Sequence, residues 1–222
     1  MMSIGNPALG QSAIVRYYRL HAWIYDLTRW TFLRGREELI RRVARQCRPQ
    51  RILEVGCGTG KNLLHLGRIF PEAQLWGLDL SPHMLARARE KLRGLRQRLT
   101  LIEAPYDRPV APGRFDLVVF SYALSMFNPG WDTALEIAGS DLSPQGTLAV
   151  VDFHDSPSKS FKQWMGVNHV RFDSHLLYLL RDRFLSNEWS ARPALGGLWS
   201  FFFFIGRNPK SKDKCRPFHK SH

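Results

Sequence analysis

A glycine-rich turn near residue 55 carries the clearest chemical signal in the chain. The apolar run Ile52–Val55 is followed by three alternate glycines, Gly56, Gly58 and Gly60, and then by a stretch with helical character. Such a turn needs glycine because its backbone takes unusual dihedral angles and approaches a ligand closely. The spacing therefore predicts a strand, a tight turn and a helix that open onto a nucleotide-like ligand.

A carboxylate, that of Asp79, follows the glycine turn at the end of a second predicted strand. The run Gln74–Leu78 is typical of a second strand, and it ends in Asp79, nineteen residues after Gly60. A carboxylate at that place can accept hydrogen bonds from both hydroxyls of a ribose. The acid Glu54, two residues before the first glycine, favours a ligand with a cationic group over a dinucleotide, which has no cation there. Dinucleotide binding remains the alternative interpretation of the turn.

The pattern Glu54-x-Gly-x-Gly-x-Gly resembles the first motif of the class I S-adenosylmethionine-dependent methyltransferases. The resemblance implies that S-adenosyl-L-methionine is the cofactor and that Glu54 faces its cationic methionine part. It also implies that Leu80 covers one face of the adenine, that Glu103 and Ala104 line the adenine edge, and that the Ser121 backbone lies near the methionyl moiety. The predicted cofactor-binding residues are Glu54, Gly56, Gly58, Gly60, Asp79, Leu80, Met84, Glu103, Ala104 and Ser121.

Apolar runs and helical patterns alternate along the chain, which predicts a parallel sheet covered on both faces. Strands are expected at 51–55, 74–78, 99–103, 115–121 and 145–152, and helices near 37–46, 60–70, 82–94, 131–140 and 160–186. Two further runs, 188–195 and 198–206, predict a closing antiparallel hairpin. The expected fold class is α/β, a Rossmann-like seven-stranded class I methyltransferase sheet with an N-terminal helical extension. Ligands of such sheets bind at the carboxyl ends of the strands, where the motif residues fall.

Positive charge is concentrated at the two ends of the chain. The formal net charge is +13, but residues 1–50 hold nine arginines against three acids, and residues 207–222 hold six basic residues against one acid. The 156 residues between them carry a net charge of only +2. We therefore predict three parts: an N-terminal helical extension over 1–48 that caps the substrate and contacts a membrane, a methyltransferase domain over 49–206, and a disordered basic tail over 207–222.

Two segments that flank the cofactor motifs narrow the resemblance. His21–Arg36 contains an Ile-Tyr-Asp element and a Gly-Arg element, and Ser121–Phe127 is followed shortly by Trp131. Together they resemble the bacterial betaine-lipid N-methyltransferases, which convert diacylglyceryl-homoserine to a trimethylated lipid, and more loosely the bacterial phosphatidylethanolamine N-methyltransferases. The resemblance implies three transfers to a lipid amine and a partner enzyme that supplies diacylglyceryl-homoserine. Pro105–Asp107 and a short region over 155–187 depart from the pattern.

The proposed product explains which acceptor residues to expect. A quaternary ammonium has no hydrogen-bond donor, so a pocket that tolerates it should use aromatic faces, which attract cations at ~0.5–2 kcal/mol each. We predict Tyr25 and Tyr122, with His154 as a proton relay, as catalytic residues. Arg29 and Arg36 match a lipid carboxylate or phosphate. The predicted substrate-binding residues are Arg29, Arg36, Trp131 and Trp199, although ordinary packing is the alternative for each aromatic side chain.

A membrane location follows from the N-terminal segment. Residues from about Ser12 to Arg36 interleave aromatic side chains with arginines, and anionic lipids attract such basic groups at ~1 kcal/mol each near the surface. No apolar run approaches the ~20 residues of a membrane span, and no secretory signal is recognised. The three cysteines lack pair or metal spacing. We therefore predict a metal-free cytoplasmic enzyme, associated peripherally with the inner face of the membrane.

Other acceptors and one non-enzymatic role stay open. A quinone C-methyltransferase would also act at a membrane, and an RNA methyltransferase could use the basic termini. Nucleic acid is disfavoured because the core is nearly neutral. Phe120–Ala123 stands where nucleobase N-methyltransferases carry Asn-Pro-Pro-Tyr or similar, which argues against nucleobase N-methylation but leaves ring-carbon and ribose methylation open. A protein that binds the cofactor without transferring methyl groups is the remaining alternative.

Overall fold

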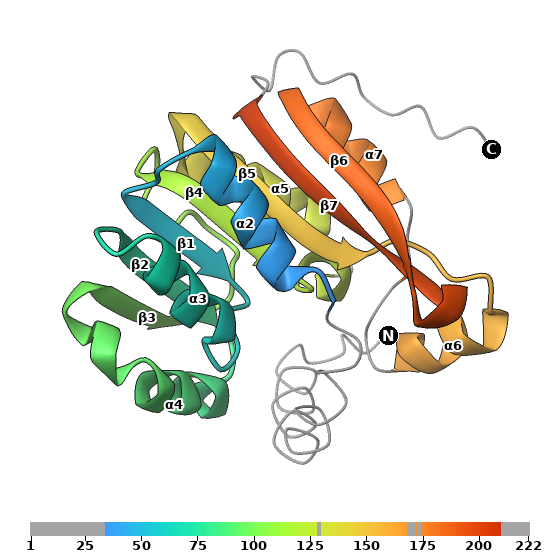
Figure 1. Cartoon of the computed structure of the whole chain (residues 1–222), viewed down its shortest axis with the longest axis horizontal. Helices are drawn as coiled ribbons and strands as arrows, with labels where there is room; N and C mark the ends of the chain where they lie inside the picture. The colour runs from blue at the N-terminus through green and yellow to red at the C-terminus, as the bar shows by residue number, and fades with distance from the viewer. Residues whose placement is uncertain (1–33, 128–129, 168–171, 173–174, 210–222) are drawn as a thin grey trace, which may run out of the picture.

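A computed structural model describes residues 34–127, 130–167, 172 and 175–209. These residues form an α/β fold around one seven-stranded sheet (Figure 1). The strands are β1 (Arg51–Val55), β2 (Gln74–Asp79), β3 (Leu99–Glu103), β4 (Phe115–Ser121), β5 (Leu142–Phe153), β6 (Phe184–Ala194) and β7 (Trp199–Pro209). Their order is β3-β2-β1-β4-β5-β7-β6. Strands β1 to β5 pair in parallel, whereas β7 runs antiparallel to both β5 and β6. The predicted Rossmann-like seven-stranded sheet is confirmed.

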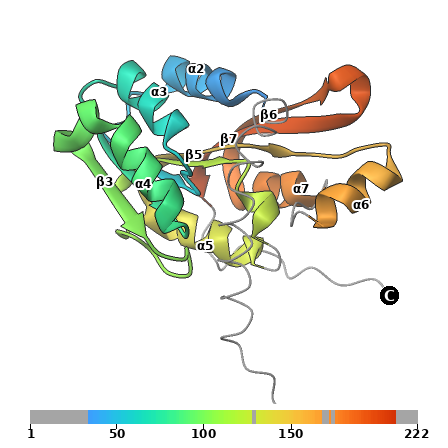
Figure 2. The ribbon, with the colours of Figure 1, turned by 90° about the horizontal axis from the view of Figure 1, so that it is seen from below.

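Helices cover both faces of the sheet. They are α2 (Arg36–Gln46), α3 (Lys61–Ile69), α4 (Pro82–Lys91), α5 (Trp131–Asp141), α6 (Lys159–Val167) and α7 (His175–Arg183), with short 3₁₀ turns η1 (Arg93–Arg98), η2 (Leu124–Met126) and η3 (Leu195–Gly197). Helices α2, α3 and α4 lie on one face, and α5 and α7 lie on the other (Figures 1 and 2). No described helix is long and apolar enough to cross a membrane.

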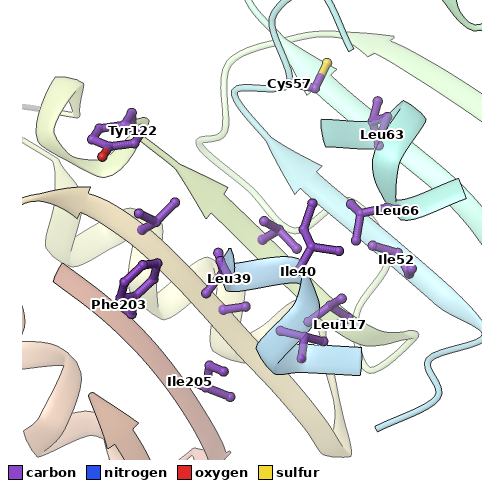
Figure 3. Close-up of a cluster of buried hydrophobic side chains, with 14 of the residues drawn as sticks. Leu39, Ile40, Ile52, Cys57, Leu63, Leu66, Leu117, Tyr122, Phe203 and Ile205 are labelled. Carbon is purple, nitrogen blue, oxygen red and sulfur yellow. The ribbon is translucent and has the colours of Figure 1, made fainter. Parts of the chain in front are cut away.

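Alternation along the strands divides the core into two layers. On β7, Phe201 and Phe203 pack with the helices of the first face, whereas Phe202 and Phe204 pack with those of the second. This follows from the two-residue period of a strand, whose successive side chains point to opposite faces. Figure 3 shows the first layer, where Leu39 and other side chains of α2 and α3 lie over the strands. An all-apolar run such as Phe201–Ile205 can therefore be a strand buried on both faces.

Helix α4 begins with the N-terminal cap that its sequence predicts. The side chain of Ser81 accepts a hydrogen bond from the Met84 N–H at 3.3 Å, and Pro82 occupies the first helical position. Such a cap satisfies a backbone donor that the helix itself leaves unpaired, and proline has no such donor to lose. The predicted start of this helix is confirmed, and the position matters because the preceding residues, Asp79 and Leu80, belong to the candidate site.

Two predicted segments have different boundaries in the structure. The predicted helical stretch over 160–186 contains two helices, α6 and α7, and its last residues belong to β6. The predicted basic tail begins inside β7, because Arg207 pairs with Ser186 and its guanidinium donates to the Gln46 carbonyl at 2.9 Å. Residues 210–222 lie outside the described residues.

The division between an N-terminal extension and the main domain also changes. The side chains of Leu39, Ile40 and Val43 on α2 are buried in the same core cluster as α3 and the sheet. Helix α2 is therefore a layer of the α/β sandwich, and the predicted boundary at residue 48 does not separate two cores there. Residues 1–33, which contain the rest of the predicted extension, lie outside the described residues.

Candidate active site

The turn after β1 has the backbone that its three glycines predict. Their φ angles are 71° at Gly56, 53° at Gly58 and 73° at Gly60, in the left-handed region that side chains disfavour. A Cβ at Gly56 would lie 2.8 Å from the Cβ of Ala123, and one at Gly60 would lie 2.6 Å from the Leu92 side chain. The turn therefore requires glycine for space as well as for conformation.

Asp79 links this turn to the end of β2. Its carboxylate accepts hydrogen bonds from the Gly58 N–H at 2.8 Å and from the Ser81 N–H at 2.9 Å. Each carboxylate oxygen has two acceptor sites, so the group can still receive the hydroxyls of a ribose. The neighbouring Leu80 exposes 59% of its surface, although it is apolar. An exposed leucine beside a carboxylate fits the ribose and one face of an adenine.

The residues predicted at the adenine edge lie next to Asp79. Glu103 is its register partner at the end of β3, and the Ala104 N–H donates to the Asp79 carbonyl at 3.3 Å. Parallel pairing brings the carboxyl ends of β2 and β3 level, which is why residues far apart in sequence meet here. Met84 lies on α4 and its side chain is buried. Its predicted contact with the cofactor stays a prediction.

Glu54 and Ser121 occupy the two central strands. Glu54 on β1 is almost fully buried, and its Oε1 accepts a hydrogen bond from the Asn62 side-chain amide at 2.8 Å. Asn62 is a site residue that the motif did not reveal; its place on the first turn of α3, two residues after Gly60, was the available signal. Ser121 ends β4, and its buried hydroxyl has no hydrogen-bond partner within the described part of the chain. Such a hydroxyl fits a polar ligand.

These residues meet where the strand order reverses. Strands β1 and β4 are neighbours, with Val55 opposite Phe120, while β2 and β3 continue one way and β5 the other. Ligands of open α/β sheets bind at this switch point. The positive-φ turn, the carboxylate of Asp79, the exposed Leu80 and the unpaired Ser121 hydroxyl together fit S-adenosylmethionine, with Glu54 and Asn62 beneath the turn.

Tyr122 follows Ser121 and has a φ of 55°, which is unusual for an aromatic residue. Its N–H donates to the Val151 carbonyl at 2.8 Å, and its hydroxyl donates to the Arg34 carbonyl at 2.7 Å. Burial raises the pKa of Tyr122 well above its usual range, so the hydroxyl stays protonated. The arrangement makes Tyr122 a link between the carboxyl end of β4 and the start of α2. Its predicted catalytic contact with the substrate stays a prediction.

Of the other predicted aromatic residues, Trp131 and Trp199 lie within the described part of the chain and differ in exposure. Trp199 has no exposed surface, because Phe153 packs against it at 5.2 Å and Phe201 at 5.7 Å between ring centroids. The structure therefore contradicts a direct acceptor contact for Trp199, whose position is that of a core residue. Trp131 begins α5, is half-buried, and meets the His175 ring edge-on at 5.8 Å.

The two arginines predicted to bind substrate have separate outcomes. Arg36 begins α2, and its guanidinium carbon lies 5.8 Å from the centroid of the Tyr122 ring. Arg36 thus reaches the same strand end as the cofactor residues, where a cation over an aromatic face is favourable. Arg29 and the predicted catalytic Tyr25 lie outside the described residues.

His154 follows β5 and is half-buried. Burial lowers the pKa of its imidazole, and Asp155 opposes that effect only in part. Its Nδ1 is buried and has no hydrogen-bond partner among the residues that the structure describes. A neutral imidazole with an unused nitrogen can accept a proton, which agrees chemically with the predicted relay but does not test it.

Asp152, just before the end of β5, is a buried residue that was not among the predicted site residues. Its carboxylate accepts hydrogen bonds from the Ser125 N–H at 3.1 Å and from the Phe153 N–H at 2.8 Å. Burial raises the pKa of Asp152 to about 6, although the hydrogen bonds from Ser125 oppose the shift. The residue ties the turn after β4 to β5. An acid inside the apolar run Val150–Phe153 was the only sequence signal.

Comparison with known proteins agrees with this site. Residues 52–146 match a protein family described as a methyltransferase domain. The chain is 36% identical over 96 residues to a malonyl-[acyl-carrier protein] O-methyltransferase of Legionella pneumophila, covering 43% of this chain and 32% of that protein. It is also 36% identical over 115 residues to a demethylmenaquinone methyltransferase of Thermus thermophilus, covering 51% of each. The chain thus spans about a third to a half of the length of these relatives.

A solved structure extends the agreement in fold. The 1,6-didemethyltoxoflavin-N1-methyltransferase of Burkholderia thailandensis, bound to 1,6-didemethyltoxoflavin and S-adenosylhomocysteine, superposes with a TM-score of 0.70 and 16% identity over 95% of this chain and 93% of that one. At this identity the likeness concerns the fold alone. The family match, the glycine turn and the residues assembled around it agree: residues 52–146 match a methyltransferase domain, the sheet has the fold of the class I methyltransferases, and the site fits S-adenosylmethionine as its cofactor.

Proposed function

We propose that the protein is an S-adenosylmethionine-dependent N-methyltransferase that acts on the amine of a lipid head group. The proposed substrate is diacylglyceryl-homoserine, and three successive transfers to its nitrogen would give a betaine lipid. The observation that carries the proposal is the junction at Arg34–Arg36. The segment that resembles lipid N-methyltransferases joins the described structure there, beside Tyr122 at the carboxyl end of β4.

The chain is held tightly where it passes this point. Gly35 has a φ of 83°, and a Cβ there would lie 2.6 Å from the Phe201 ring and 2.7 Å from the Phe203 ring. Directly before it, the Arg34 carbonyl accepts the hydroxyl of Tyr122. These contacts support a role for the preceding segment on the acceptor side of the site, because they fix where it leaves the domain. Tyr25 and Arg29 lie five to nine residues before Arg34 in that segment.

The chemistry demands little beyond alignment and exclusion of water. Bound S-adenosylmethionine would supply a methyl group on a positively charged sulfur. As the amine nitrogen attacked in line, the carbon–sulfur bond would break and S-adenosylhomocysteine would leave. Asp79 and the glycine turn hold the ribose end of the cofactor, and Ser121 lies where the methionine end is expected. His154, neutral at physiological pH because its pKa is lowered, is suited to accept the proton that the amine loses. Aromatic faces such as Tyr25 and Trp131 would attract the cationic product.

The curated relatives do not define the acceptor. One of those reported above is an O-methyltransferase of a malonyl group carried by a protein, and the other is a methyltransferase of demethylmenaquinone. Their similarity covers 43% and 51% of this chain. That portion contains the cofactor residues. The match to the demethylmenaquinone enzyme favours a quinone C-methyltransferase as the second candidate, since a quinone is also a membrane-borne substrate.

A membrane surface is the partner that suits a lipid substrate. Residues 1–50 carry a net charge of +6, and basic groups near an anionic bilayer gain ~1 kcal/mol each. We propose that the N-terminal segment rests on the inner face of the membrane and that the domain receives head groups there. An enzyme that makes diacylglyceryl-homoserine would supply the substrate.

Lipid mass spectrometry tests the proposal directly. A bacterial host without betaine lipids would express this chain alone, the enzyme that makes diacylglyceryl-homoserine alone, or both. We expect a trimethylated homoserine lipid only when both are present. Methylated ethanolamine lipids in the host with this chain alone would move the assignment to the phosphatidylethanolamine branch. Asp79→Ala is the matched inactive control, because it removes the ribose-binding carboxylate.

Assays with purified protein separate the remaining alternatives. Vesicles that contain diacylglyceryl-homoserine, demethylated menaquinone extracts or bulk RNA would each be incubated with radiolabelled S-adenosylmethionine. Label in the lipid amine alone is the expected result. Label in the quinone would favour the second candidate. Cofactor binding by calorimetry, with no label in any acceptor, would contradict the lipid assignment.

A further inference from the structure

A buried carboxylate far from the glycine motif holds the loop between β3 and β4. Asp141, the last residue of α5, is fully buried. It accepts three hydrogen bonds: from the Tyr106 hydroxyl at 2.9 Å, the Val110 N–H at 3.0 Å and the Ala111 N–H at 2.8 Å. All three donors belong to the loop over 104–114. A carboxylate that gathers three donors from one loop fixes that loop against the helix.

Tyr106 connects this anchor to the centre of the site. Its ring packs edge-on against Phe120 at 6.0 Å between centroids, and Phe120 directly precedes Ser121 on β4. Burial and the neighbouring Asp141 raise the pKa of Tyr106, so its hydroxyl remains a donor. The same side chain thus touches the end of β4 with its ring and the end of α5 with its hydroxyl.

The loop begins at the adenine side of the cofactor site. Ala104, its first residue, donates its N–H to the Asp79 carbonyl, and Glu103 pairs with Asp79 across the strands. Tyr106 follows Ala104 by two residues, so a short stretch of backbone joins the anchored ring to the expected ribose and adenine positions. The hydrogen bond to Asp141 is the contact that prevents the hydroxyl end of that ring from leaving the core.

We infer that Tyr106 and Asp141 are positioning residues for the cofactor: they fix the loop that lines the adenine side of the site. The inference rests on the methyl-donor half of the proposed function and is independent of the acceptor. Neither residue belongs to the glycine motif. Their effect is exerted through Ala104 and Asp79, which lie at the cofactor, while Tyr106 and Asp141 remain buried behind them.

Tyr106→Phe is the sharpest test, because it keeps the ring and removes one hydrogen-bond donor. Isothermal titration calorimetry with S-adenosylhomocysteine should show about five- to twentyfold weaker binding, since a buried acceptor that loses its partner destabilises the conformation that depends on it. With a methyl acceptor in hand, KM for S-adenosylmethionine should rise while kcat changes little. Asp141→Asn should weaken binding in the same direction.

Asp116→Asn is the matched control for a merely structural effect. Asp116 also anchors backbone donors, the N–H groups of Gln50 at 3.0 Å and Arg51 at 2.9 Å, but it does so at the amino ends of β1 and β4, away from the site. The control should lower the melting temperature and leave the affinity for S-adenosylhomocysteine within twofold of the unaltered protein.

The inference would be overturned if Tyr106→Phe lowered the melting temperature as the control does and left the affinity unchanged. Hydrogen exchange measured by mass spectrometry provides a second readout: the amides of residues 104–114 should exchange faster in Tyr106→Phe than in Asp116→Asn, and equal protection would count against the inference. Calorimetry requires no acceptor, so failure of the lipid assignment would leave these results interpretable.

Discussion

The two halves of the sheet are built in different ways. Strands β1, β2 and β3 are five or six residues long and end in a turn and side chains held by hydrogen bonds at about 2.8–3.3 Å. Strands β5, β7 and β6 are eleven or twelve residues long and are held by aromatic packing. The first half holds the residues proposed to bind the cofactor, whose shape is constant. The second half lies on the side proposed for the acceptor, which differs among methyltransferases, and we expect that packing can be altered there without disturbing the first half.

The packed half derives its stability from aromatic contacts that converge on Trp199. The ring centroids of Tyr122 and Phe153 lie 4.7 Å apart, and those of Phe153 and Trp199 lie 5.2 Å apart, both in edge-to-face geometry. Such pairs contribute about 0.5–1.5 kcal/mol each beyond the area they bury. The contacts also reach Tyr122 and, through its hydroxyl, the N-terminal segment. The comparison therefore predicts that mutations in the two halves separate stability from cofactor affinity.

The largest expected effect is on stability in the packed half. Trp199→Ala should lower the free energy of unfolding by about 3–5 kcal/mol, because it leaves a cavity among fully buried rings. Urea denaturation measures the loss, and calorimetry on the fraction that remains folded should show nearly unchanged cofactor affinity. Trp189→Ala, on the exposed face of β6, is the control and should cost about 1 kcal/mol or less. Equal losses would contradict the comparison.

The next effect is on cofactor affinity in the other half. Gly56→Val places a branched side chain at a φ of 71° and within 2.8 Å of Ala123, so the turn must change shape. Calorimetry with S-adenosylhomocysteine should show a loss of about 100-fold or more. The control is Gly94→Ala, which has open space around its Cβ and should bind normally. Normal binding by Gly56→Val would remove the turn from the site.

A third prediction concerns pH and the boundary between the halves. The pKa of Asp152 is raised by burial to about 6, so the folded protein binds more protons than the unfolded chain between about pH 4 and pH 6. The contribution of Asp152 to stability is therefore present at low pH and is lost as pH rises through 6, by as much as roughly 3 kcal/mol. Asp152→Asn should lack this dependence.

Urea denaturation of both proteins from pH 4 to pH 8 measures the difference. The free energy of unfolding of the unaltered protein, minus that of Asp152→Asn, should fall between about pH 4 and pH 6 and then remain level. A difference that does not vary with pH would contradict the raised pKa.

The smallest effect should be at the link between the halves. Tyr122→Phe removes the hydrogen bond to the Arg34 carbonyl and keeps the ring, so the free energy of unfolding should fall by about 1 kcal/mol. We expect unchanged cofactor affinity and slower transfer to lipid vesicles, measured with radiolabelled cofactor. If transfer proceeded at the normal rate, the proposed role of the Arg34–Arg36 junction on the acceptor side would be lost.

Sequence patterns predicted the cofactor half more fully than the acceptor half. The five parallel strands, α3 to α5 and the places of Gly56, Gly60 and Asp79 follow from periodicity, turn chemistry and spacing within about 25 residues. The prediction failed for Trp199, whose side chain is fully buried among other aromatic rings. The sequence pattern around an apolar residue near a site is the same whether its side chain faces a ligand or the core. Only the packing of distant segments decides between the two.

The chain by itself determined where the strands lie, which turn must hold a ligand and which carboxylate stands beside it, because these depend on neighbouring residues. Only the tertiary structure decided that Asp141 holds the loop of Tyr106, that Asp152 ties β5 to the turn after β4, and that the hydroxyl of Tyr122 meets Arg34. Those contacts join residues 27 to 88 positions apart. Each depends on a buried polar group finding its partner after the sheet has closed, and no local pattern encodes that choice.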